Sequence, residues 1–102
     1  MAEGNIQISN YIRKTYSATK SYAANDIVIF TGDDLDVSNP NGYSPLCIRS
    51  VQFSSGNITL SYCNVGASGS SNMIIGRNDT NASGTVEVTI NIIYAPTSMI
   101  KF

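Results

Sequence analysis

The most constraining feature of the sequence is a strict alternation of apolar and polar residues from Thr85 to Tyr94. The apolar members share one parity: Val86, Val88, Ile90, Ile92 and Tyr94. The other parity carries Glu87, Thr89 and Asn91, and Ile93 interrupts it near the end of the run. A period of two gathers the apolar side chains on one face of a β-strand, whereas a helix would scatter them. The run therefore predicts a long strand with one buried face, and with both faces covered near Ile93.

Weaker signals of the same kind predict the rest of the fold. We expect further strands at residues 5–9 (as an edge strand), 15–22, 25–30, 46–53, 58–63 and 71–77. Residues 46–63, which turn at Ser54–Asn57, predict a hairpin, and a change of parity near Ser50 predicts a β-bulge. The apolar run Ile27–Phe30 predicts a buried strand, and Tyr62, like Tyr94, has the parity of a core residue.

No segment has the 3.6-residue period of an amphipathic helix, so we expect little helix. Six to seven short strands separated by turn residues predict an all-β fold, a single antiparallel β-sandwich or jelly-roll-like domain. The sandwich is expected to span residues 12–95. Residues 1–11 are expected to form an N-terminal arm or an edge strand. Residues 96–102 form an apolar C-terminal tail that should dock on its own domain or on a neighbour.

The composition narrows the function. Charged residues make up 13 % of the chain, about half the usual share, so Ser, Thr and Asn must supply the polar surface. Such a surface suits neutral partners such as sugars, or packing against other protein copies, and a plain solvated surface explains it equally well. The densest basic cluster, Arg13, Lys14 and Lys20, is too small for a nucleic-acid groove.

The chain also lacks the residues that most catalytic sites need. It has no histidine, which removes the commonest general base, and no glycine-rich phosphate-binding motif. We therefore expect neither an enzyme nor a cofactor. Asp33, Asp34 and Asp36 could hold calcium, but a solvated turn is the favoured interpretation, and no metal is predicted. Cys47 and Cys63 are expected to be free thiols, because nothing in the sequence indicates an oxidising compartment.

Two further absences concern location. No stretch approaches the roughly 20 apolar residues that span a membrane, and Met1–Asn5 lacks the apolar core of a signal peptide. A protein of this kind is made and used in a cytoplasm, or leaves the cell by lysis as virus particles do.

A set of short motifs, taken in order, resembles a known family. Lys14–Ser17 opens an early strand, Gly42–Leu46 opens the central hairpin, and Arg77–Asn78 precedes the turn into a last strand that ends Ile92–Tyr94. Over residues 12–95 this order resembles small β-sandwich domains of bacteriophage structural proteins. Many of these lie at the C-termini of tail fibres and receptor-binding tips of phages of Gram-positive bacteria.

The resemblance implies a role on the virion and a threefold assembly, and it supplies no binding residues. Such tips usually follow a long shaft. These 102 residues contain none, so a standalone capsid fibre or decoration protein and an excised tip both stay open.

The leading hypothesis is a virion surface protein, made in the cytoplasm of the bacterial host, that presents loops to a host-surface glycan or to another virion protein. Its loops 31–44 and 64–70 are the expected recognition elements. The candidate ligand contacts are tyrosines: Tyr11, Tyr16, Tyr22 and Tyr43. The candidate interface residues are Arg77, Met99, Ile100 and Phe102. Expected partners are further copies in a homotrimer, other virion proteins and a glycan, with no nucleic acid and no membrane insertion. The alternatives are a decoration or head-fibre protein without host contact and, more weakly, a cellular carbohydrate-binding module.

Overall fold

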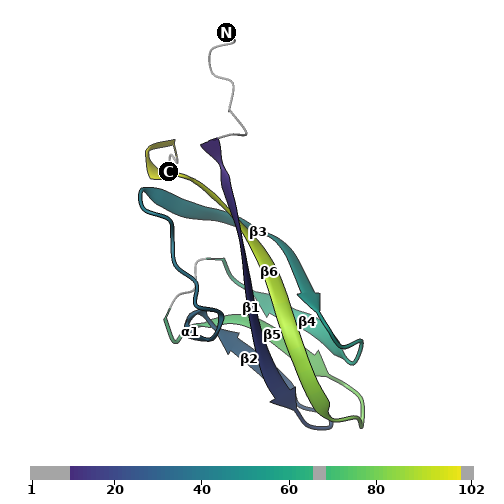
Figure 1. Ribbon diagram of the computed structural model, residues 1–102. Helices are drawn as coiled ribbons and strands as arrows, with labels where there is room; N and C mark the ends of the chain where they lie inside the picture. The colour runs from purple at the N-terminus through teal and green to yellow at the C-terminus, as the bar shows by residue number, and fades with distance from the viewer. Residues whose placement is uncertain (1–9, 66–68, 100–102) are drawn as a thin grey trace.

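The computed structural model describes residues 10–65 and 69–99 of the chain. The strands are β1 (Ile12–Tyr22), β2 (Ile27–Thr31), β3 (Tyr43–Phe53), β4 (Ile58–Cys63), β5 (Asn72–Asn78) and β6 (Gly84–Pro96). One helical turn, α1 (Gly32–Leu35), follows β2, and a 3₁₀ turn, η2 (Thr97–Met99), follows β6. The strands form two three-stranded antiparallel sheets (Figure 1). The prediction of an all-β antiparallel sandwich is confirmed.

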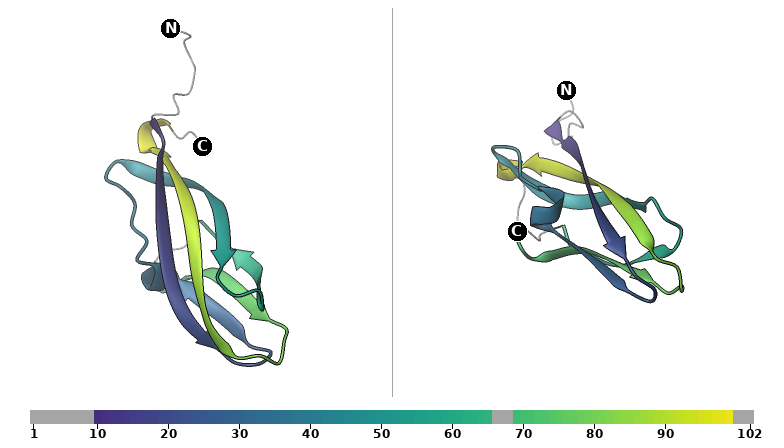
Figure 2. Two further views of the ribbon diagram at one scale, coloured as in Figure 1. Left: turned by 45° about the vertical axis from the view of Figure 1, so that its right-hand side comes forward. Right: turned by 60° about the horizontal axis from the view of Figure 1, so that its bottom comes forward.

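The strand order is that of a single three-stranded antiparallel sheet that has been folded in half to give two layers. Sheet A has the order β1-β6-β3 and sheet B the order β2-β5-β4. A short turn therefore joins each strand of sheet A to the strand in the same position of sheet B: β1 to β2, β3 to β4, and β5 to β6. The three turns, residues 23–26, 54–57 and 79–83, lie together at one end of the molecule (Figures 1 and 2). Four of the five links between consecutive strands pass from one sheet to the other, which makes the topology jelly-roll-like.

The hairpin predicted over residues 46–63 is therefore wrong. β3 pairs with β6, and β4 pairs with β5, so the turn at Ser54–Asn57 joins two sheets. The backbone N–H of Ser54 bonds to the carbonyl of Glu87, and the N–H of Ile58 bonds to the carbonyl of Ser55. Both strands bury one face in the same core, and alternation alone cannot tell a hairpin from a strand that bends around a core.

The core lies between the sheets, and β6 is its centre. All five residues of the predicted apolar parity in this strand are completely buried: Val86, Val88, Ile90, Ile92 and Tyr94. Phe30, Met73 and Ile74 pack against them from sheet B. The expected β-bulge is confirmed by a shift in the β3–β6 register between Ile48 and Ser50. The strand expected at residues 5–9 lies outside the described residues.

Sheet B is less buried than the sequence predicts. In β2 only Val28 and Phe30 are buried, and Ile27 and Ile29 are exposed, so this strand is half-buried. Tyr62 is also exposed, because the register shifts between Leu60 and Tyr62. A shift of one residue moves a side chain to the opposite face of a sheet. No described segment of the chain covers the outer face of sheet B, so the prediction of Tyr62 as a core residue is wrong.

The α1 turn was not expected, and its cap explains it. The Thr31 hydroxyl accepts from the backbone N–H of Asp34, and the Asp34 carboxylate accepts from the N–H of Thr31. This reciprocal capping satisfies the first N–H groups of a helix. The Asp34 carboxylate also pairs with Lys20 at 2.8 Å, and these bonds lower the pKa of Asp34.

Sheet A is longer than sheet B, and this difference positions the site. The strands of sheet A have 11, 13 and 11 residues, while those of sheet B have 5, 7 and 6. Since the turns align the sheets at one end, sheet A extends beyond sheet B at the other. This overhang contains the beginnings of β1 and β3 and the end of β6 (Figure 1).

Candidate functional site

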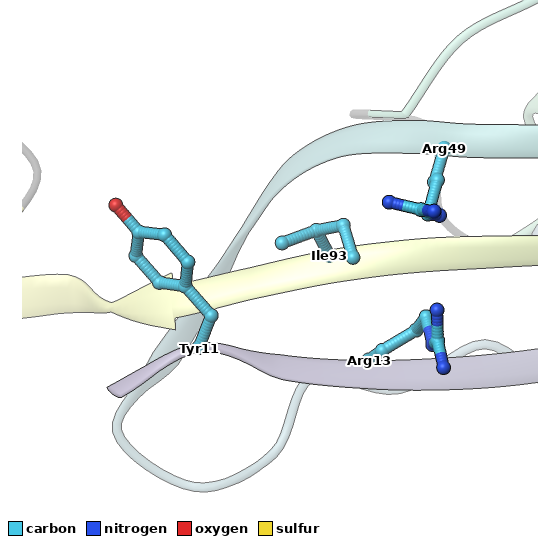
Figure 3. Close-up of a pocket in the computed structure, with 4 residues that line it drawn as sticks. All are labelled: Tyr11, Arg13, Arg49 and Ile93. Carbon is cyan, nitrogen blue, oxygen red and sulfur yellow. The ribbon is translucent and has the colours of Figure 1, made fainter. Parts of the chain in front are cut away.

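The outer face of sheet A carries a shallow hollow in the overhang. Four residues line it: Tyr11, Arg13, Arg49 and Ile93. We call it the arginine hollow, and its volume is about 440 Å³. Figure 3 shows the Ile93 side chain on β6 at its centre, flanked by Arg13 from β1 and Arg49 from β3, with the Tyr11 ring at one end.

Strand register explains how these residues meet. Arg13 lies directly opposite Ile93 in the β1–β6 pairing, and Cys47 lies opposite Ile93 on the other side. Arg49 occupies the bulge between Ile48 and Ser50. Ile48 and Val51 both pack against the core, so the two residues between them, Arg49 and Ser50, are left for the outer side. The bulge thereby places Arg49 beside Ile93, and bulges are a known means of re-aiming a side chain.

The arginine hollow carries two positive charges that no described carboxylate neutralises. Within the described residues, no carboxylate forms an ion pair with Arg13 or Arg49; the two ion pairs found there are Lys20–Asp34 and Arg77–Asp79. The described carboxylates lie elsewhere: Asp33, Asp34 and Asp36 at α1, Asp26 and Asp79 in the turns, and Glu87 near the start of β6. Glu87 is six residues from Ile93 along the strand, or roughly 20 Å. That separation exceeds the Debye length of about 8 Å at physiological salt, so Glu87 does not neutralise the pair.

The predicted ligand tyrosines have different fates. Tyr11 lines the arginine hollow and is half-exposed. Tyr16 and Tyr22 are buried, at 8 % and 7 % exposure, so neither ring offers a face to a ligand, and these two candidates are corrected. Tyr43 is half-buried and packs against the core at the start of β3.

The hydroxyls of the two buried tyrosines serve the fold. The Tyr16 hydroxyl donates to the carbonyl of Ser38 and bonds to the Tyr94 hydroxyl at 2.8 Å. The Tyr22 hydroxyl bonds to Ser55 and accepts from the Asn57 amide, and these bonds lower the pKa of Tyr22. Parity on β1 would have identified both rings as inward-facing, because they share it with the half-buried Ile12 and Ala18.

The predicted interface residues are only partly described. Arg77 is exposed and makes a 3.4 Å contact with Asp79, two residues along the chain. The side chain of Met99, and all of Ile100 and Phe102, lie outside the described residues. The start of the tail is held: the N–H of Thr97 donates to the carbonyl of Gly42, and its hydroxyl bonds to that of Ser44.

A second surface feature is an apolar row across the outer face of sheet B. Ile29, Ile75 and Tyr62 lie opposite one another on β2, β5 and β4, and Ile27 lies beside them. Four of the five exposed large apolar side chains in the described part of the chain belong to this sheet: Ile27, Ile29, Leu60 and Tyr62. Exposed apolar side chains are therefore more concentrated on sheet B than on sheet A.

The two predicted recognition loops touch each other. The N–H of Asp33 donates to the carbonyl of Gly69 at 2.7 Å, and the N–H of Gly32 donates to that of Ser71. Residues 66–68 lie outside the described part. Over residues 10–65 and 69–99, no three acidic or cysteine side chains gather as metal ligands would. Cys47 and Cys63 are free, exposed and on different sheets.

Comparison with known proteins adds no relative. No protein-family model, no curated protein and no solved structure matches this chain. Neither helical turn in the described residues has the length and hydrophobicity to cross a membrane.

Proposed function

We propose that this protein is a non-catalytic module of a bacteriophage virion surface, of the tail-fibre or receptor-binding-tip kind, and that it binds a host-surface glycan at the arginine hollow. The observation that carries the glycan part is the composition of the hollow: an aromatic ring, an apolar floor and two guanidinium groups on one exposed face. The phage part is supported by the order of motifs along residues 12–95.

The chemistry of the hollow suits a sugar. A pyranose ring has a face of C–H groups, which packs on an aromatic ring, and a rim of hydroxyls, which accept hydrogen bonds. Tyr11 and Ile93 would contact the face, while Arg13 and Arg49 donate to the rim. Three paired strands support the floor, so little order has to be gained on binding. Affinity at one site would be modest, and many copies on a particle would supply avidity.

The apolar row favours a second role beside this one. Exposed apolar residues on one sheet suit packing against copies of the chain, as in the proposed homotrimer, or against another virion protein. A decoration or head-fibre protein would need only this face and would not use the hollow.

The test is binding to an array of bacterial surface polysaccharides. The native chain should bind a subset of them without releasing a product, and Tyr11→Ala should lower the signal at least about fivefold. Tyr62→Ala is the matched control, because it removes an exposed tyrosine from the other sheet. An array on which the native protein binds nothing contradicts the glycan role and leaves the decoration role as the better proposal.

A further inference from the structure

We infer that the glycan unit held in the arginine hollow carries a negative charge, either a carboxylate or a phosphate, which sits between Arg13 and Arg49 above Ile93. This inference rests on the proposed glycan-binding function and names the ligand class. It departs from the expectation, drawn from composition, that a chain with few charges binds neutral partners.

The spacing of the two arginines suits one small anion. They lie on β1 and β3, the two neighbours of β6, and strands in a sheet are about 4.8 Å apart. Their backbones are therefore roughly 10 Å apart across the sheet. Figure 3 shows the Arg49 side chain extending from β3 toward β6, and the Arg13 guanidinium group across β6 from it, on the same side of Ile93. Each presents a planar set of N–H donors that matches the two oxygens of a carboxylate or phosphate.

Arg13 and Arg49 form no ion pair within the described residues, so both guanidinium groups can bind an external anion. Arg77 has Asp79 and Lys20 has Asp34, but Arg13 and Arg49 face each other without a carboxylate. Two like charges side by side repel, which costs stability in the free protein. An anion between them removes that repulsion and gains charge-assisted hydrogen bonds. Ile93 supplies an apolar surface beside the two exposed arginine side chains.

A charged saccharide fits better than a nucleic acid or an acidic protein segment. Among the described residues, two cations line the hollow, and a phosphate-rich strand extending from it would run toward Glu87 along β6 or beyond the sheet edges. The Tyr11 ring adjoins the same space and supplies a stacking surface for one sugar ring. One anion and one ring face together describe an acidic monosaccharide unit.

The experiment measures binding of three soluble probes to the full chain by calorimetry. The probes are a galacturonate oligosaccharide, a sugar phosphate such as glucose 1-phosphate, and a neutral maltose oligosaccharide. One of the two charged probes should bind at least about tenfold more tightly than the neutral one, because a hydrogen bond between two charged groups is about twice as strong as a neutral one. Binding should weaken as salt is raised. The charged probe that binds identifies carboxylate or phosphate as the recognised group.

Variants separate this inference from the proposed function. Arg13→Gln and Arg49→Gln should each lower affinity for the charged probe about tenfold, and Arg77→Gln, which alters an exposed arginine elsewhere, should not change it. Lysine at either position keeps the charge and loses the planar donors, so it should give an intermediate affinity. Circular dichroism checks that each variant is folded.

Two results overturn the inference in different ways. If the neutral probe binds as well as the charged ones and the arginine variants bind normally, the glycan function stands and the anionic ligand class is wrong. If none of the three probes binds and the polysaccharide array is also blank, the proposed function fails and the inference fails with it.

Discussion

Asn78 is the only polar residue among the described ones that is buried, at 1 % exposure, and its side chain uses its full bonding capacity. Its amide donates to the carbonyls of Ala23 (2.7 Å) and Ala82 (2.8 Å). Its oxygen accepts from the N–H (3.0 Å) and the hydroxyl (2.6 Å) of Thr80. The Asn78 side chain thus joins the turn between β1 and β2 to the turn between β5 and β6. It holds in place two of the three turns that connect the sheets.

Asn78→Ala should lower the free energy of unfolding by roughly 2–4 kcal/mol, because it leaves several buried polar groups without partners. Urea denaturation measures this change. Asn81→Ala is the matched control: Asn81 lies in the same turn, is exposed, and bonds only to the Asn25 amide, so its loss should cost less than about 0.5 kcal/mol. Equal stability of both variants would show that Asn78 does not hold the bend.

Tyr94 predicts how stability responds to alkali. Burial, and then its bond to Tyr16, raise the pKa of Tyr94 above the usual value of about 10. In the unfolded chain this tyrosine ionises near pH 10, whereas in the folded chain it stays neutral to higher pH. Its contribution is complete below about pH 10 and is lost as pH rises from there toward the folded-state pKa. Tyr94→Phe should therefore flatten the loss of stability above pH 10, measured by urea denaturation across pH. Tyr62→Phe removes the hydroxyl of an exposed tyrosine and is the control for the substitution itself.

At the scale of elements, Gly76 on β5 has no room for a side chain, because Ile58 of the neighbouring strand β4 and Phe53 of β3 in the other sheet lie close to it. A Cβ atom there would lie 2.5 Å from Ile58 Cγ2 and 3.3 Å from Phe53 Cζ. Gly76→Ala should cost roughly 1–3 kcal/mol by overpacking, detected by thermal denaturation. Ile58→Ala removes the clashing methyl, so the double variant should lose less than the sum of the two single losses. Gly56→Ala meets nothing within 4 Å and is the control. Strict additivity of the pair would rule out this contact as the cause.

The sequence predicts strands well and their partners poorly, and β3 and β4 show why. Alternation reports which side chains face a core, and it located β6, β5 and the bulge near Ser50 correctly. It carries no information on which strand forms the hydrogen bonds, so a turn between sheets looked like the turn of a hairpin. It also fails where a face lacks a cover, as on sheet B, because Ile29 and Tyr62 follow the pattern of buried residues and are exposed.

The candidate site was predictable in one residue of four. The sequence identifies Tyr11 as one of four tyrosines that could contact a ligand. Arg13 was considered only as part of a basic cluster with Lys14 and Lys20, whose side chains lie over Tyr16 and Phe30 instead. Arg49 and Ile93 enter the hollow through cross-strand register and a bulge, which come from long-range pairing. One local feature of the sequence does indicate the site: Ile93 interrupts the polar face of its strand, and it forms the floor of the hollow.

At the scale of the whole molecule, the outer faces of the two sheets differ in chemistry, and the difference suits ligand binding on one face and self-association on the other. The outer face of sheet A carries hydroxyls and amides that bond across strands, such as Thr15 to Asn91, and it carries the arginine hollow. The outer face of sheet B carries the apolar row. A module that packs against its copies through sheet B would keep sheet A, with its hollow, free for a ligand. The proposed trimer and the proposed glycan site are therefore compatible.

Native mass from light scattering after size exclusion tests this arrangement. The monomer mass is 10.9 kDa, and the proposed assembly predicts three times that value, persisting on dilution. Ile29→Lys places a charge in the middle of the apolar row and should yield monomers, since burying an unpaired charge in an interface is costly. Leu46→Lys alters the exposed leucine of sheet A and should leave the assembly intact. A native chain that is already monomeric contradicts self-association through sheet B. In that case the apolar row would serve as a contact for another virion protein. Multivalent binding through the arginine hollow would then require several copies of the protein on one particle.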